Sequence, residues 1–502
     1  MRRLAVALVA VLAAGCLGSP SPPPRAVVPA DVGFDPSSVR VTEVQVEHAT
    51  LASWDGARLA AVAYVPQTTD RLPDGAAPRW PVAVFVHGWG QQKESYEGQR
   101  STVPGVPVPD GAGENRLEQF ARAGILAIAY DARGFGKSEG RTSVAGPAER
   151  MDLAAVIDFA TARYPTNGRV GVIGASYGGG HALQAWAREP KVTTAVAMHG
   201  WVDLYGALLP QNVPKLEWAQ LLYLHGAAGA KGDYDPMIHA WYQQVYTRSD
   251  LAAVRWQMDE RSVLPLLGQV RKPLLLCQGM QESLFPQADQ AWEGAGGFTR
   301  AIVSTGGHGT SDPTCWARAL AWFQFFLGGH DTKVDQWPAL QTVDASGIGP
   351  PVEYDAFPRA APRTYHPRLE ALDEGPATGA TFTVQQRLAA NPLHEPSALW
   401  DASGMPAQRL PAGLREDPAG SLFTSPSLDG AEVLVGAPRL RLHVREGEAP
   451  YQVAATLYLL RPDGTSLVLS RGAAAALNQT DAPDGFLEVP MTWTRAATAP
   501  GD

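Results

Sequence analysis

Cysteine is scarce in this sequence, which has only Cys16, Cys277 and Cys315 among 502 residues. So few thiols exclude a scaffold built on several disulfides, and the fold must depend on a hydrophobic core. We expect Cys277 and Cys315 to be isolated core thiols, although an oxidising compartment would allow them to pair. Histidine and cysteine nowhere show the spacing of a metal-ligand set, so we expect no metal and no other cofactor.

Runs of basic residues are also missing, and the formal net charge is -9. A nucleic-acid partner is therefore not expected, and small molecules or peptides are the expected ligands. The apolar content of 45% suits a packed protein, and the length predicts two folded units after a short leader.

No transmembrane helix is expected at the N-terminus, where the apolar run 4–14 is only 11 residues long. It follows Met1-Arg2-Arg3, as in a secretory signal. The run ends in Leu12-Ala13-Ala14-Gly15-Cys16, which resembles the lipobox of bacterial lipoproteins and implies lipidation of Cys16. Ala13 departs from that pattern, and a plain cleaved signal is the alternative.

We therefore predict a signal peptide over 1–16 and a Pro-rich tether over 17–39. The expected location is the extracytoplasmic side of a bacterial cell, with the protein anchored to the membrane through its lipid.

Residues 40–335 alternate short apolar runs with helical patterns, which predicts an α/β fold with a doubly wound, mostly parallel sheet. The clearest expected strands are 82–86, 125–130, 170–173, 194–198, 273–277 and 301–304. Ligands of such sheets bind beyond the carboxyl ends of the strands, so the residues after each run are candidate site residues.

Ser176 is the candidate nucleophile. It lies in Gly174-Ala175-Ser176-Tyr177-Gly178, between an expected strand and an expected helix. The G-x-S-x-G pattern is typical of a strained strand-turn-helix elbow in which small neighbours leave the hydroxyl exposed above the sheet. The pattern predicts the α/β-hydrolase fold.

A serine hydroxyl needs a base, and in this fold the chain order is serine, acid, histidine. His308 follows the last expected strand and is the candidate base. Glu282 is the only carboxylate in the loop after 273–277 and is the candidate acid, with Asp203 as the rival. For the oxyanion hole we expect the backbone amides of Tyr177 and Trp89.

The chain from about 50 to 330 resembles the X-prolyl dipeptidyl aminopeptidase and cocaine esterase family of serine hydrolases. The motifs that carry the resemblance are Asp131-Ala132-Arg133-Gly134-Phe135-Gly136-Lys137-Ser138, the elbow at 174–179, Gln278-Gly279 with Leu284-Phe285-Pro286, and the segment 322–329. The resemblance implies Ser176 as nucleophile and His308 as base. It departs at Glu282, where that family ordinarily has aspartate.

Two further regions fit the resemblance. An insertion at about 201–269, rich in aromatic residues, predicts a helical cap over the site. Residues 345–502 show period-two alternation and a turn at Arg461-Pro462-Asp463-Gly464, and they resemble the family's C-terminal jelly-roll β-sandwich. Family members continue with further strands, so this sandwich is expected to be abbreviated or truncated.

The predicted activity is hydrolysis of ester or peptide bonds through an acyl-enzyme. An X-prolyl dipeptidyl peptidase and a carboxylic ester hydrolase share this machinery and are about equally favoured. A catalytically inactive, surface-bound binding module is the alternative from another class. The sequence leaves the oligomeric state open.

Overall fold

The computed structural model describes two regions. In the N-terminal region it describes residues 4–8, 39–72, 74–98, 114–230, 233–309, 312–347 and 349–358. In the C-terminal region it describes residues 366–368, 371–373, 381–384, 409–410, 425, 427–428, 430–444, 451–476 and 486–498. Cys16 and residues 17–38 of the Pro-rich tether lie outside these ranges. None of the described helices is long and apolar enough to span a membrane.

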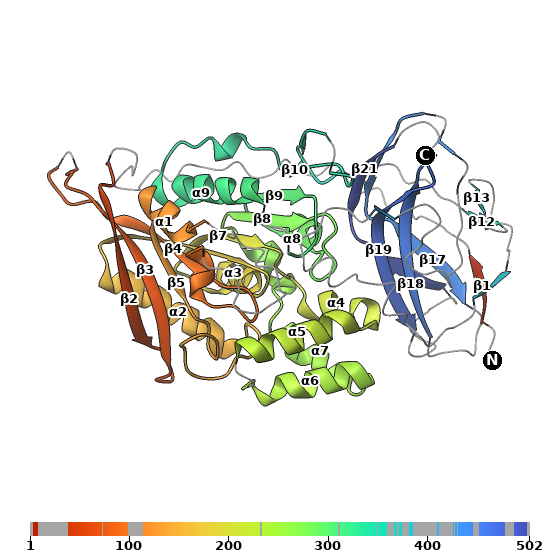
Figure 1. The fold of residues 1–502 in the computed structure, drawn as a ribbon, viewed down its shortest axis with the longest axis horizontal. Helices are drawn as coiled ribbons and strands as arrows, with labels where there is room; N and C mark the ends of the chain where they lie inside the picture. Colours follow the sequence, from red (N-terminus) through yellow and green to blue (C-terminus); the bar gives the residue numbers. More distant parts are fainter. Residues whose placement is uncertain are drawn as a thin grey trace.

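A ten-stranded sheet forms the centre of the larger region (Figure 1). Its strand order is β11-β10-β9-β8-β7-β6-β4-β5-β3-β2. The strands are β2 (Glu43–Ala52), β3 (Arg58–Gln67), β4 (Trp80–Val86), β5 (Leu126–Tyr130), β6 (Thr166–Ala175), β7 (Val192–Met198), β8 (Leu274–Gly279), β9 (Thr299–Ser304), β10 (Leu340–Thr342) and β11 (Val352–Tyr354).

Strands β4 to β10 pair in parallel, whereas β2, β3 and β11 are joined antiparallel at the two edges. The predicted mostly parallel sheet is therefore confirmed. The six runs expected as strands fall on β4 to β9. They are mostly apolar because helices cover the sheet on both faces.

Helices α2 (Pro147–Arg163), α3 (Tyr177–Arg188) and α8 (Ala288–Gly294) cover one face of the sheet. Helices α1 (Arg116–Arg122) and α9 (Pro313–Gly328) cover the other, where aromatic side chains of α9 are buried against the strands. Short 3-10 turns lie at η2 (Lys93–Tyr96) and η5 (Val334–Gln336). The core thus lies in two layers on either side of the sheet.

The chain between β7 and β8 forms a separate group of helices (Figure 1). These are α4 (Leu204–Leu208), η3 (Pro210–Asn212), α5 (Leu216–Gly229), α6 (Pro236–Thr247), α7 (Leu251–Asp259) and η4 (Leu264–Gln269). We call this group the cap.

The C-terminal region is built of antiparallel strands (Figure 1). They are β12 (His366–Arg368), β13 (Ala371–Asp373), β14 (Thr381–Val384), β15 (Arg409–Leu410), β16 (Val433–Gly436), β17 (Arg439–Val444), β18 (Tyr451–Leu460), β19 (Ser466–Ala476), β20 (Phe486–Pro490) and β21 (Thr494–Ala497). The predicted hairpin joins β18 to β19, and Gly464 takes a left-handed φ of 81° in its turn. The N-terminal strand β1 (Leu4–Leu8) pairs with β14 and β17.

The two regions are joined through buried contacts. Arg495 of β21 forms an ion pair with Asp344 at 3.3 Å, and its backbone oxygen accepts a hydrogen bond from Ala345. Leu459 and Leu467 belong to the same hydrophobic cluster as the core of the larger region. The segment after β10, which includes Asp344 and Ala345, is therefore bound to the C-terminal region through Arg495.

Candidate active site

The turn between β6 and α3 places Ser176 above the carboxyl edge of the sheet. Ser176 has φ 58° and ψ -117°, a backbone conformation that L-residues rarely adopt. Two glycines make the turn possible: a Cβ on Gly178 would lie 1.9 Å from the backbone oxygen of Val86, and one on Gly174 would lie 2.5 Å from Gly178. The elbow expected from the sequence is therefore present, with its strain concentrated at the serine.

His308 lies in the loop that follows β9, within reach of the serine. Its Nε2 is 2.7 Å from Ser176 Oγ, and its Nδ1 is 2.8 Å from Oε2 of Glu282. A carboxylate only accepts hydrogen bonds, so Nδ1 carries the proton and Nε2 accepts the serine hydroxyl. The three residues predicted from chain order therefore form one continuous hydrogen-bonded chain.

Glu282 is fully buried in the loop after β8. Its Oε1 accepts the backbone N–H groups of Leu284 at 2.8 Å and Phe285 at 2.9 Å. Burial alone would raise the pKa of Glu282, but charge interactions and hydrogen bonds with His308 and His199 hold that pKa well below its ordinary value. The side chain is therefore an anion beside the imidazole.

The rival carboxylate occupies a different position. Asp203 is the N-cap of α4, where its side chain accepts the backbone N–H of Gly206 at 3.0 Å. N-capping is a common role for aspartate at the start of a helix. The structure thus gives Asp203 a structural partner and brings Glu282 to the imidazole.

The loop after β4 brings Trp89 to the site, with its side chain directed to the cap. The indole N–H donates to the backbone oxygen of Leu222 at 2.7 Å, and the ring contacts that of Tyr177 with centroids 5.3 Å apart. Tyr177 is the first residue of α3, so its amide lies at the positive end of that helix. Both residues predicted for the oxyanion hole therefore lie in one cluster beside the elbow.

The neighbouring His87 has a structural environment. It is fully buried; its Nε2 accepts the backbone N–H of Ala132 at 2.9 Å, and its Nδ1 lies 2.8 Å from the Gly88 oxygen. Both ring nitrogens have partners, and the bond from Ala132 joins the loop after β4 to the loop after β5. Burial lowers the pKa of His87, which keeps the ring neutral.

Direct hydrogen bonds join the acid loop after β8 to the base loop after β9. The backbone of Gln281 donates to Gly306 O at 3.0 Å, and its side-chain oxygen accepts Gly306 N–H at 2.6 Å. The same side chain donates to Ala345 O at 3.2 Å. A Cβ on Gly279 would lie 2.1 Å from Gly306 O, so the loops touch through their backbones.

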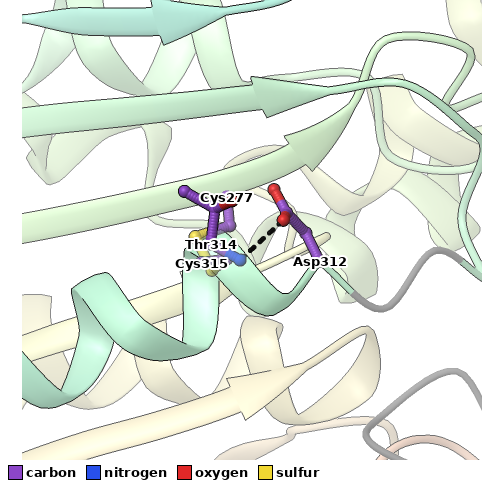
Figure 2. The surroundings of a disulfide bond; sticks show 4 residues. All are labelled: Cys277, Asp312, Thr314 and Cys315. Carbon is purple, nitrogen blue, oxygen red and sulfur yellow. Dashed lines mark hydrogen bonds between the residues drawn. A yellow bond between two sulfur atoms is a disulfide. The ribbon is translucent and has the colours of Figure 1, made fainter. Parts of the chain in front are cut away.

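A disulfide between Cys277 and Cys315 adds a covalent link (Figure 2). Cys277 lies in the second half of β8 and Cys315 in the first turn of α9, whose N-cap is Asp312. Our expectation of isolated thiols is therefore wrong. The two cysteines are 38 positions apart in sequence, so the sequence does not reveal that β8 and α9 are neighbours, and only the folded sheet brings them together.

The cap contributes contacts that sequence reasoning missed. Trp218 of α5 donates its indole N–H to Ser283 Oγ at 2.8 Å, and its ring centroid lies 5.4 Å from that of His308. Lys215, the N-cap of α5, donates to Leu284 O at 2.9 Å. The aromatic content of the insertion was visible in the sequence, but nothing there distinguished Trp218 from the other rings.

His199 is a further residue near the triad that sequence reasoning missed. Its Nδ1 lies 2.8 Å from Oε2 of Glu282. Among the described residues, His199, Glu282 and His308 form a group whose side-chain atoms lie within 4.8 Å of one another, a spacing that a metal would also accept. Because these atoms bond to one another and to Ser176, we assign no metal ligand here.

Comparisons with known proteins match both regions of the chain. The family model described as X-Pro dipeptidyl-peptidase (S15 family) matches residues 55–310, and the model of the X-Pro dipeptidyl-peptidase C-terminal non-catalytic domain matches 332–492. An uncharacterized 31.7 kDa protein of Escherichia coli is 36% identical over 137 residues, and the match spans 42% of that protein's length.

Solved structures share the fold at low sequence identity. A CocE/NonD family hydrolase of Staphylococcus aureus has a TM-score of 0.63 at 16% identity, covering 92% of this chain and 85% of that one. An α-amino acid ester hydrolase has a TM-score of 0.62 at 14% identity, covering 96% and 91%. With the S15 catalytic model matching half of its residues, the chain belongs to the X-Pro dipeptidyl-peptidase (S15) family.

Proposed function

We propose that this protein is a serine hydrolase that cleaves ester or peptide bonds through an acyl-enzyme. The observation that carries the proposal is the chain from Ser176 Oγ through His308 to Glu282, with successive separations of 2.7 Å and 2.8 Å. These are the contacts that activate a serine as a nucleophile. The strained φ of Ser176 supports the same role, because such strain concentrates at functional sites.

In the proposed reaction, Ser176 Oγ attacks the substrate carbonyl carbon while its proton passes to His308 Nε2. Glu282 stabilises the resulting imidazolium through Nδ1. The amides of Tyr177 and Trp89 donate to the oxygen that becomes negative, and such a donor contributes about 10²- to 10³-fold in rate. His308 then protonates the leaving alcohol or amine. Water, deprotonated by the same base, hydrolyses the acyl-enzyme and frees Ser176.

Peptides that begin with an X-Pro pair are the first substrate class we propose, because family models match both the catalytic region and the C-terminal region. Carboxylic esters are the second candidate, because the α-amino acid ester hydrolase shares the fold over 96% of this chain. A panel should compare alanyl-prolyl p-nitroanilide with p-nitrophenyl acetate and butyrate. A kcat/KM higher for the anilide identifies a peptidase, and a preference for the esters identifies an esterase.

Ser176→Ala is the test of the mechanism. We expect the variant to lose turnover of every substrate in the panel and to lose labelling by a fluorophosphonate probe, with its thermal unfolding retained. Persistence of both turnover and labelling would overturn the assignment. Glycan binding by the protein without any turnover would instead favour the inactive binding module.

We further propose that the protein is exported and anchored through lipidated Cys16. The disulfide supports export, because disulfides form and persist in oxidising compartments. Cleavage before Cys16 would remove β1 from its place between β14 and β17. Mass spectrometry of the N-terminal peptide from a membrane fraction tests the proposal, with Cys16→Ala as the control that should release the protein from membranes.

A further inference from the structure

His199 lies directly after β7 and contacts the acid of the candidate triad. Its backbone has a left-handed φ of 49°, and its N–H donates to Cys277 O at 2.8 Å. These features turn the ring toward the neighbouring strand β8 and its acid loop. The side chain is buried, and its Nδ1 lies 2.8 Å from Oε2 of Glu282.

Four described N–H groups converge on the Glu282 carboxylate. Leu284 and Phe285 donate from the backbone to Oε1, and His199 donates to Oε2. His308 Nδ1 lies 2.8 Å from Oε2 and 3.0 Å from Oε1. A carboxylate has about four acceptor positions, so the four donors match its capacity. His199 is the donor that restrains Oε2 independently of the catalytic base.

Glutamate needs this restraint more than aspartate does, because its longer side chain has one more rotatable bond. The terminal torsion of a glutamate is broad, so Oε2 is not fixed by rotamer preference. We propose that His199 is a positioning residue, which donates from Nδ1 to Glu282 and holds Oε2 against His308 Nδ1. This inference rests on the proposed roles of Ser176, Glu282 and His308.

The ring of His199 lies beside the Glu282 carboxylate and the ring of His308. The His308 ring lies 5.6 Å away, and a cation on His199 would oppose the imidazolium that His308 forms during the reaction. Two other charged residues on the surrounding elements have partners of their own. Lys215 donates to Leu284 O in the acid loop, and Asp203 accepts the N–H of Gly206. The shared carboxylate is thus the group through which His199 acts.

Two substitutions at position 199 separate hydrogen bonding from space filling. His199→Gly removes the donor, and His199→Asn places an amide N–H where Nδ1 lies. Both residues tolerate a left-handed φ, so neither adds backbone strain. His48→Ala, at an exposed position of β2, is the control for general effects of losing a histidine.

We expect His199→Gly to lower kcat/KM about 10- to 100-fold, mostly through kcat, which is the effect of losing a hydrogen bond to a charged group. His199→Asn should recover activity to within about threefold of the wild type. With one donor fewer, the Glu282 carboxylate keeps more of its negative charge toward His308, which favours the protonated form of His308. The acid limb of the kcat/KM profile should therefore lie at higher pH in His199→Gly than in His199→Asn.

The measurements are initial rates across pH, thermal unfolding and fluorophosphonate labelling of each variant. Wild-type kcat/KM in a folded His199→Gly would overturn the inference, as would a folded His199→Asn as slow as His199→Gly. An unlabelled, inactive wild type would instead overturn the proposed function.

Discussion

Removal of the Cys277–Cys315 disulfide should destabilise the protein without rearranging the site. The bond closes a loop in which the cysteines are 38 residues apart, and both Glu282 and His308 lie inside that loop. The chain-entropy relation for such a loop gives a loss of about 4 kcal/mol in the free energy of unfolding. For a domain as large as the catalytic region, this loss in the free energy of unfolding lowers Tm by about 8 °C.

The assay is thermal unfolding of the wild type and of the Cys277→Ala/Cys315→Ala variant, each with and without reductant. Reductant should lower the wild-type Tm toward that of the variant and leave the variant unchanged. Below the transition, kcat should change little, because Gln281 still joins the acid and base loops through its bonds to Gly306. An unchanged Tm, in protein that mass spectrometry shows to be fully reduced, would refute the reasoning.

Three further predictions concern single side chains. Glu282→Gln should lower kcat by about 10⁴-fold. Asp203→Ala should keep kcat and lower the free energy of unfolding by about 1 kcal/mol, because it removes an N-cap. Equal losses of activity in the two variants would contradict these roles. Glu149 is fully buried, which by itself would raise its pKa, but His181 and other hydrogen-bond donors lower that pKa from 4.5 to about 2. Its contribution to stability is complete above about pH 4.5 and is lost as the pH falls toward about 2, so acid unfolding of Glu149→Gln should be shallower across this window. Gly178→Ala should cost about 3 kcal/mol or more, because its Cβ would lie 1.9 Å from a backbone oxygen; a wild-type Tm in that variant would show that the elbow relaxes.

Local sequence patterns were sufficient for much of the fold. Apolar runs of strand length identified β4 to β9, because strands covered on both faces must be apolar along their whole length. The elbow could be recognised in the sequence because a strained serine turn allows only small residues at the positions of Gly174 and Gly178. Chain order then indicated Glu282 and His308, since residues after successive parallel strands meet at one edge of the sheet.

The sequence by itself thus determined the fold class, the family resemblance and the nucleophile and base of the candidate triad, and it left two carboxylates as candidates for the acid. Only the tertiary structure decided between Glu282 and Asp203, paired Cys277 with Cys315, and brought His199 and Trp218 to the triad. Each of these contacts joins segments far apart in sequence. They depend on β7, β8 and β9 lying side by side and on the cap lying over their ends, and no local pattern of residue types encodes that adjacency.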